Sequence, residues 1–293
     1  MADGLTLGIP LAVLASALFG TGDFLGGLAA RRASALMVTL VVSVLGALPT
    51  VLLLGQFPGV PTGADLLWGV GSGVSGALGV TLLYHVLARG PVGVMAPIVA
   101  VCGVAVPVAA GLALGERPTW AAGFGMLLAA GAVLLVSASA PAGGDGATRP
   151  RAERAVVLLA VLAGLGLGGF LVLLARVGPA AGLLPLVTAR AAGAVTVLLV
   201  LLARREPLAL PPAARVPAIA GALVDGVANV LYLLVVRSHA VSIVGTIVSL
   251  GPGFAVVLGH FVLRERFTRT QVLGLACAAV AIVLLTGGGD AGG

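Results

Sequence analysis

The sequence contains little charge, no lysine and only two cysteines. Charged residues make up 9% of the 293 residues, against about 25% in soluble globular proteins, and 60% are hydrophobic. Cys102 and Cys277 lie far apart inside apolar runs, without the spacing of metal ligands, so we expect them to pack in the interior. This composition argues against a soluble globular domain and indicates a chain that resides in a lipid bilayer.

Several motifs of enzymes and ATPases are also absent. There is no Walker loop, which excludes built-in ATP hydrolysis, and there is no HExxH motif, cysteine cluster or convincing catalytic triad. We therefore expect neither an enzyme nor a bound cofactor or metal ion.

The basic residues do not form a nucleic-acid-binding surface. The formal net charge is +6, and all sixteen basic residues are arginines that occur singly or in small groups near the ends of apolar runs. Arginines in such positions contact anionic lipid headgroups and bias the orientation of a membrane protein. We expect membrane lipids, and not nucleic acid, as partners.

Long apolar runs fill most of the chain. Each is about 20 residues long, enough for a helix to cross the hydrocarbon core, and the alternating pattern of a membrane barrel is absent. The first run is too long for a signal peptide and contains Asp23, so we treat it as mature structure. We predict an all-α, multi-pass protein of the cell membrane with ten transmembrane helices. The ten runs are 7–30, 34–55, 66–88, 91–114, 119–138, 155–176, 182–203, 216–236, 240–263 and 270–287.

The arginines are distributed unequally between the two sides of the predicted bundle. Twelve lie in loops after odd-numbered runs, three lie on the opposite side, and Arg190 lies within a run. The positive-inside rule would place the twelve in the cytoplasm and both termini outside it. The three on the opposite side are Arg117, Arg176 and Arg237.

A hydrophilic stretch near the middle of the chain, SASAPAGGDGATRPRAER at 137–154, has the proline, glycine and charge content of a flexible linker. Similar motifs recur on either side of it at an offset of 148 to 149 residues. YHVLARGPVG at 84–93 resembles YLLVVRSHAV at 232–241, and LALGERPT at 112–119 resembles FVLRERFT at 261–268. The sequence therefore contains an internal repeat.

We predict a first five-helix repeat over residues 1–138, a linker over 139–154 and a second five-helix repeat over 155–293. Because five is an odd number of crossings, the second repeat is inverted relative to the first. Inverted repeats are typical of transporters, whose binding site lies near the midplane between the repeats.

These features resemble the drug/metabolite transporter superfamily, and within it the EamA family, over nearly the whole chain. The resemblance rests on the two five-helix halves, on GERPT at 115–119 and RERFT at 264–268, and on the opening FGTGDFLGG at 19–27. It implies a ten-helix bundle around a central cavity and movement of small metabolites, often export, by alternating access. Family members are usually drawn with both termini in the cytoplasm, opposite to the arginine distribution here. The second half also departs from the first, since Arg264 replaces the glycine before the glutamate.

Polar side chains share one face of the predicted eighth helix. Asp225, Asn229 and Tyr232 occur at i, i+4 and i+7, which places them on one side of a helix. The corresponding face of the third helix contains Thr81 and Tyr84. We expect substrate to be bound by residues of these faces, namely Tyr84, Asp225, Asn229 and Tyr232.

Three ionisable groups lie well inside apolar runs: Asp23, Arg190 and Asp225. A charge at that depth is costly, so such groups face a cavity or one another. Arg190 could bind a carboxylate or phosphate of the substrate, or it could neutralise Asp23 or Asp225. Asp225 could bind a substrate cation or a proton, or it could form a structural ion pair with Arg190. A substrate that competes with an internal pair would reconcile these hypotheses.

Asp23 lies among four glycines, which permit close helix approach and weaken the local helix. Loosened backbone at membrane depth occurs where it lines a cavity or is buried in protein. We expect Asp23 to face the central cavity near one mouth and to bind substrate or a coupling proton. The alternative is an interfacial position near Arg31 and Arg32.

Two glutamates and three prolines are candidates for structural or gating roles. Glu116 and Glu265 follow the fourth helix of each repeat, and we expect them to fix the turn between the last two helices; gating is the alternative. Pro97 and Pro107 in one fourth helix, and Pro252 in the other, should bend these helices. Bent helices at matching positions indicate a lined cavity, and packing within the bundle is the alternative.

The sequence therefore predicts a secondary transporter of a small polar or amphipathic metabolite, with export as the expected direction and protons as a candidate coupling ion. The alternatives are a non-transporting membrane scaffold, an intramembrane enzyme and a channel. The inverted repeat and the missing catalytic set argue against the first two. The short extent of the polar strip argues against a channel.

Overall fold

The computed structural model describes residues 2–89, 92–138, 154–264 and 268–287, and these ranges contain helices and connections but no strand. The all-α prediction is therefore confirmed for the described residues. The first part of the chain forms α1 (Ala2–Ala30), α2 (Ala35–Leu45), α3 (Ala47–Leu53), α4 (Gly63–Arg89), α5 (Val92–Ala113) and α6 (Trp120–Ala138). The second part forms α7 (Arg154–Ala175), the short η1 (Pro179–Ala181), α8 (Leu184–Arg204), α9 (Pro212–Val236), α10 (Val241–Val248), α11 (Gly251–Leu263) and α12 (Arg269–Gly287).

Each predicted run corresponds to one helix or to a broken pair of helices. The pairs are α2 with α3, interrupted at Gly46, and α10 with α11, interrupted at Ser249 and Leu250. Among the described residues, 7 helical segments are long and apolar enough to cross a membrane, and shorter apolar helices lie in α5, α6 and α12. The chain is a multi-pass membrane protein, and its count of ten crossings stays a prediction.

The break between α10 and α11 follows from Pro252 in the first turn of α11. Proline has no N–H to donate to the carbonyl four residues earlier, which here belongs to Val248. That carbonyl instead accepts a hydrogen bond from the Ser16 hydroxyl of α1, with an Oγ–O distance of 3.3 Å. A side chain from the first part of the chain thus satisfies a backbone group left free in the second part.

A second carbonyl that lacks its helical donor because of a proline also accepts a hydrogen bond from a side chain. Pro217 lies inside α9, so the carbonyl of Ala213 lacks its helical donor. It accepts a hydrogen bond from Arg32 Nη1 at 3.1 Å. Arg32 follows α1, so this contact also joins the two parts of the chain.

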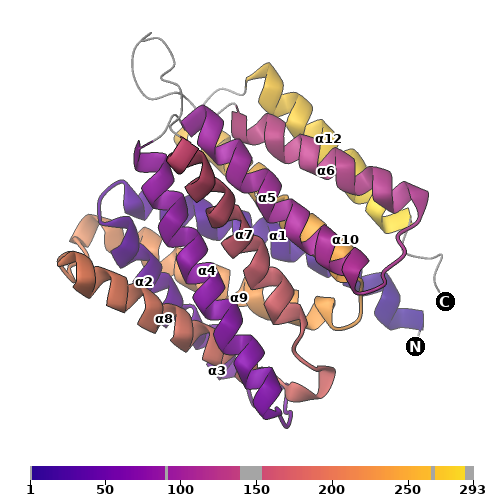
Figure 1. Ribbon diagram of the computed structural model, residues 1–293, viewed down its shortest axis with the longest axis horizontal. Helices are drawn as coiled ribbons and strands as arrows, with labels where there is room; N and C mark the ends of the chain where they lie inside the picture. Colours follow the sequence, from indigo (N-terminus) through magenta and orange to yellow (C-terminus); the bar gives the residue numbers. More distant parts are fainter. Residues whose placement is uncertain (1, 90–91, 139–153, 265–267, 288–293) are drawn as a thin grey trace.

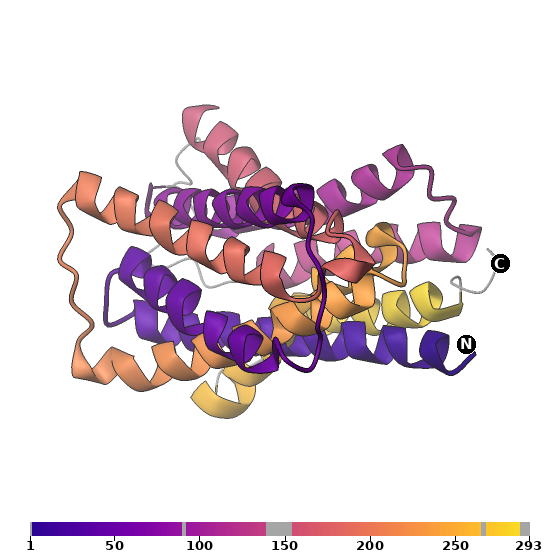
Figure 2. The ribbon, with the colours of Figure 1, turned by 90° about the horizontal axis from the view of Figure 1, so that it is seen from below.

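The most extensive helix contacts run between the two parts of the chain and not within them. In the first part, α1 lies along α9 and also contacts α11. In the second part, α7 lies along α4 and also contacts α5. The last helices, α6 and α12, lie side by side at one edge of the bundle in both views (Figures 1 and 2). The two parts are therefore interleaved rather than stacked as separate bodies.

Both chain termini lie at the same end of the bundle, which we call the terminal end (Figure 1). The connections 54–62, 176–183 and 237–240 also meet there, because Val60 donates its N–H to Ala180 and Arg237 donates to the Gly182 carbonyl. The opposite end, which we call the basic end, carries the connections 31–34 and 205–211.

The largest cluster of buried side chains lies toward the terminal end. It groups residues from the last turns of α7 and α9, the first turns of α6 and α8, and the whole of α10. The buried clusters toward the basic end, such as that of Ala29, Val38, Ala214 and Ala218, are smaller. The terminal end is thus the more tightly packed of the two.

Candidate functional site

An ion pair lies at mid-depth between α8 and α9. Arg190 Nη2 of α8 is 2.6 Å from Asp225 Oδ2 of α9, and the two side chains are only 12% and 19% exposed. The same guanidinium nitrogen lies 3.3 Å from the backbone carbonyl of Asp225. The mutual neutralisation of Arg190 and Asp225, expected as one of two alternatives, is present in this structure.

Asn229 extends this arrangement along α9. Its Nδ2 donates to the Asp225 carbonyl at 2.8 Å and lies 3.3 Å from Asp225 Oδ2. Its Oδ1, like Arg190 Nε, is buried and accepts or donates no hydrogen bond within the described part of the chain. Such unpaired buried groups are costly in isolation and are available to a bound ligand.

Two further segments approach the ion pair closely. A Cβ added to Gly46, at the break between α2 and α3, would lie 3.2 Å from Arg190 Cζ. A Cβ added to Gly22 of α1 would lie 3.2 Å from Asp225 Cβ. Glycine at these two positions lets α1 and the α2–α3 break approach the pair closely.

Asp23 lies beside this pair, on the neighbouring face of α1. Gly22 faces α9, while Gly20 lies against the Gly251 carbonyl of α11, so Asp23 falls on the arc between these two contacts. Its side chain is nevertheless exposed. A carboxyl directed between two packed helices and still exposed indicates an open space at that point.

The open space widens along α1 toward the basic end. At Gly20 the helices α1 and α11 are in backbone contact, since an added Cβ would lie 2.2 Å from the Gly251 carbonyl oxygen. At Gly27, two turns further, an added Cβ would meet nothing within 4 Å. We call this exposed stretch of α1 beyond its contact with α11, bordered by Asp23 and Gly27, the α1 wedge.

Tyr232 lies differently from what its spacing predicted. We expected it to line a cavity with Asp225 and Asn229, but its side chain is fully buried, and its hydroxyl donates to the Leu171 carbonyl of α7 at 2.7 Å. Near its C-terminus α9 is enclosed by the main core cluster, so this face of the helix is open only further from the terminal end.

Some of the remaining predicted residues lie outside the part of the chain that the structure describes. Glu265 and the side chains of Tyr84 and Pro97 lie outside the described residues. Pro107 is buried in α5, where its Cβ would be 2.4 Å from a Cβ added to Gly245 of α10. It therefore packs against the short helix that precedes the proline break.

Glu116 joins the two parts of the chain at the terminal end. Its carboxylate accepts hydrogen bonds from the N–H groups of Val241 and Ser242, at 2.7 and 3.1 Å, and so caps the N-terminus of α10. We expected Glu116 to fix the turn between α5 and α6. The observed contact reaches across to α10, whose own preceding residue, Ala240, has no side-chain donor or acceptor.

Asp65 was not among the predicted residues. Its carboxylate accepts from the N–H of Gly178 at 2.8 Å and from the N–H and hydroxyl of Thr62 at 2.8 and 2.6 Å. Thr62 Oγ1 in turn lies 3.2 Å from the Asp65 N–H. The T-x-x-D spacing of a capping box was the available signal for this contact.

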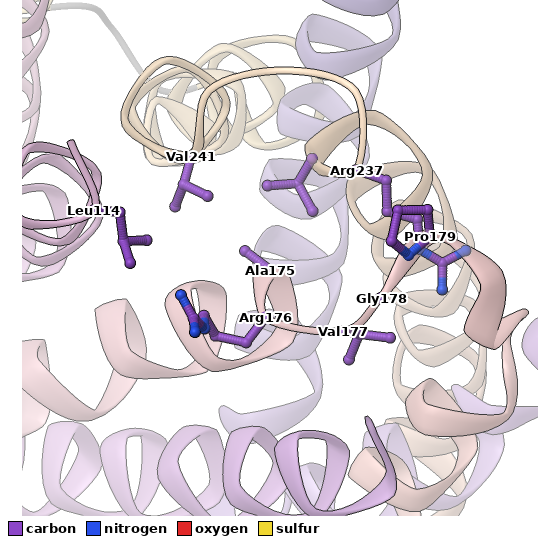
Figure 3. A pocket seen from close by; sticks show the side chains of 9 residues that line it. Leu114, Ala175, Arg176, Val177, Gly178, Pro179, Arg237 and Val241 are labelled. Atoms are coloured by element: carbon purple, nitrogen blue, oxygen red, sulfur yellow. The ribbon is translucent and has the colours of Figure 1, made fainter. Parts of the chain in front are cut away.

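A hollow of about 230 Å³ lies at the terminal end, away from the ion pair (Figure 3). It is bordered by the end of α7 with Arg176, by Arg237 after α9, and by Val241 at the start of α10. Figure 3 shows Arg176 and Arg237 on opposite sides of it. An adjoining hollow of about 380 Å³ has apolar walls from α4, α5 and α7, with Arg176 over the Trp68 ring at its edge. Among the described residues, no group of three histidine, cysteine, aspartate or glutamate side chains could hold a metal ion.

Comparison with known proteins agrees with this architecture. A crystal structure of a protein is 16% identical to this chain and has a TM-score of 0.74. The match covers 95% of this chain and 96% of that one, and at this identity it shows the fold alone. No curated protein matches the chain. The model of the EamA-like transporter family matches twice, over residues 6–138 and 154–287. The chain therefore belongs to the EamA-like transporter family, a family of membrane transporters of small molecules.

Proposed function

We propose that this protein is a secondary transporter that moves a small polar or amphipathic metabolite by alternating access, with export as its direction. The proposed halves are residues 1–138 and 155–293, joined by the linker 139–154 and inverted relative to each other. The substrate site lies between them at mid-depth. Its proposed residues are Asp23, Tyr84, Arg190, Asp225 and Asn229, together with Tyr232 in a state in which its hydroxyl no longer bonds the Leu171 carbonyl.

The observation that carries the proposal is the ion pair of Arg190 and Asp225 next to an exposed Asp23. Buried charges in a membrane protein are expensive and mark binding sites and ion pathways more often than they mark simple packing. The pair also leaves Arg190 Nε and Asn229 Oδ1 without partners in the described structure, so a ligand has polar atoms to bind.

The contact pattern of the helices supports the inverted arrangement. The pairs α1–α9 and α7–α4 are equivalent under the repeat, and so are α1–α11 and α7–α5. A site between such interleaved halves can be exposed to one side at a time when the halves rock against each other. The dense terminal end and the α1 wedge toward the basic end fit a state open at the basic end.

Proton coupling through Asp23 is part of the proposal. An exposed carboxyl beside Asp225 can change its protonation state without breaking a hydrogen bond, because Asp23 makes none with the described residues. If the Asp23→Asn variant transports at the parent rate with unchanged pH dependence, the coupling role is wrong.

A thermal-shift screen against a metabolite library tests the substrate site. A ligand that binds the folded protein raises its melting temperature by mass action. We expect one class of compounds to stabilise the parent in detergent and to lose this effect in Arg190→Ala and Asp225→Ala.

The charge-swapped variant, Arg190→Asp combined with Asp225→Arg, is the matched control. It keeps a neutral pair but reverses its direction. If the swap restores both stability and the ligand shift, the pair is structural and the site lies elsewhere. If it restores stability but not the shift, the pair contacts the ligand.

A further inference from the structure

We infer that the proposed transport site selects cationic substrates, with Asp23 as the carboxylate that receives the positive group. The inference rests on the proposed function and narrows it to a substrate class. From the sequence alone, one arginine and two acids leave both anions and cations open. The geometry assigns the three charges different roles.

The positive charge of the site is already compensated. Arg190 Nη2 lies 2.6 Å from Asp225 Oδ2 and is also within 3.3 Å of the Asp225 carbonyl. Asn229 Nδ2 contacts the same carboxylate oxygen at 3.3 Å. An anionic substrate would have to displace Asp225 from Arg190, which would leave that carboxylate buried and unpaired.

The charge of Asp23 is not compensated. Asp23 makes no hydrogen bond and no ion pair with any residue that the structure describes, and its side chain is exposed in the α1 wedge. Asp225, which packs against Gly22 next to Asp23, has the same sign and adds to the negative potential there. Asp23, Asp225 and Arg190 together leave one net negative charge at the inner end of the wedge, while Arg31 lies one turn beyond Gly27 at its outer end.

The space beside Asp23 can admit a ligand. Gly27, one turn from Asp23 toward the basic end, is exposed and has no atom within 4 Å of an added Cβ. A cationic group such as an ammonium that enters the wedge reaches Asp23 before it reaches the neutralised pair. We therefore assign the substrate to amines or other organic cations of small size.

A thiol placed at Gly27 measures the sign of the potential in the wedge. Gly27→Cys is made in a background with Cys102→Ala and Cys277→Ala, so that it is the reactive thiol. Its rates with a cationic reagent, 2-(trimethylammonium)ethyl methanethiosulfonate, and an anionic one, 2-sulfonatoethyl methanethiosulfonate, are compared with those of free 2-mercaptoethanol. Melting temperatures check the fold, and Phe24→Cys provides a second thiol if Gly27→Cys is unstable.

We expect the cation-to-anion rate ratio to be at least about tenfold higher with Asp23 than with Asp23→Asn in the same background, because unit charges a few ångström apart interact by several RT at the effective dielectric of protein sites. Arg31 lies one turn beyond Gly27 and is present in both variants, so the comparison isolates the contribution of Asp23. Glu206→Gln, which removes one negative charge near the basic end, should leave the ratio unchanged and serves as the matched control.

The outcomes separate this inference from the proposed function. If both reagents react and Asp23→Asn leaves their rate ratio unchanged, the wedge is open to water but Asp23 does not select cations, and the inference is overturned while the transport site stands. If neither reagent reacts in a folded variant, Asp23 does not face an aqueous opening. The proposed site then fails together with the inference.

Discussion

Gly20 of α1 and Gly168 of α7 are 148 residues apart, and they occupy equivalent positions in the two proposed repeats. Each allows a close crossing of helices. Gly20 lies against the Gly251 carbonyl of α11, and Gly168 lies against the Gly103 carbonyl of α5, where an added Cβ would be 2.8 Å away. Gly103 and Gly251 are themselves 148 residues apart. In both crossings, therefore, a glycine packs against the backbone carbonyl of an equivalent glycine.

The side chains beside the two crossings are different. Three residues after Gly20, Asp23 is exposed in the α1 wedge; three residues after Gly168, Leu171 is only 8% exposed. The Leu171 carbonyl also accepts the hydrogen bond of the Tyr232 hydroxyl. The buried side chains of Leu171 and Tyr232 therefore close the α7 crossing. A shared crossing geometry thus supports an open, charged site in one half and a packed, neutral one in the other.

The repeat thus determines where the helices cross, and single side chains determine which crossing is open. In the proposed transport cycle, this structure corresponds to a site open at the basic end and closed at the terminal end. Substitutions on the two sides test whether the α1 and α7 crossings differ in this way.

The largest effect is expected at the ion pair beside the α1 crossing. Arg190→Ala should lower the free energy of unfolding by about 3–5 kcal/mol, because Asp225 is left buried without its counter-charge. Chemical unfolding in mixed micelles measures the change. Arg176→Ala is the control, since this exposed arginine after α7 lies over the Trp68 ring and its removal should cost about 0.5–1 kcal/mol. Equal costs at the two arginines would contradict a buried, paired Arg190.

Gly20→Ala and Gly168→Ala should each cost about 1–3 kcal/mol, because the added methyl group forces two packed backbones apart. Gly27→Ala, in open space on the same helix, should change stability by less than about 0.5 kcal/mol. Melting temperatures of the three variants in one detergent provide the measurement. A large loss at Gly27 would mean that α1 and α11 also pack closely there.

Glu116→Ala removes the side-chain cap of α10 at the closed end and should cost about 1 kcal/mol. Glu116→Gln keeps a carbonyl acceptor and should cost less, since only the favourable charge at the helix N-terminus is lost. Equilibrium unfolding of both variants separates the two contributions. An unchanged stability of Glu116→Ala would show that water caps α10 as well as the carboxylate does.

Tyr232→Phe removes the hydroxyl that bonds the Leu171 carbonyl and should cost about 0.5–1.5 kcal/mol. The same variant should make the α7 crossing more open, which faster amide hydrogen exchange in α7 would report. Exchange at the parent rate would indicate that apolar packing alone closes this crossing.

Asp23→Asn should have the smallest effect on stability, within about 0.5 kcal/mol, because the carboxyl is exposed and makes no polar contact with the described residues. Thermal unfolding next to the parent measures it. A loss of stability comparable to that of Arg190→Ala would indicate that Asp23 has a polar partner. The α1 crossing would then not be the open one of the two.

The helical runs, the break at Pro252 and the pairing of Arg190 with Asp225 as one of two alternatives follow from the sequence, because hydropathy, missing N–H groups and buried charge act locally or pairwise. The Asp65 capping box could also have been found from its spacing. The bond from Tyr232 to Leu171 and the cap that Glu116 provides to α10 could not, because they depend on which helices become neighbours.

The interleaving of the two parts also bears on how the protein is made. When α1 enters the bilayer, its main partners α9 and α11 have not yet been synthesised. Its glycine-lined face therefore contacts lipid or other helices until α9 and α11 have been synthesised. Small residues suit this delay, because lipid chains make few contacts with them. The flat helix surface that they form is then free to pack closely against α9 and α11 once these helices are made. The same glycines that shape the finished crossing thus keep the unfinished chain ready for assembly.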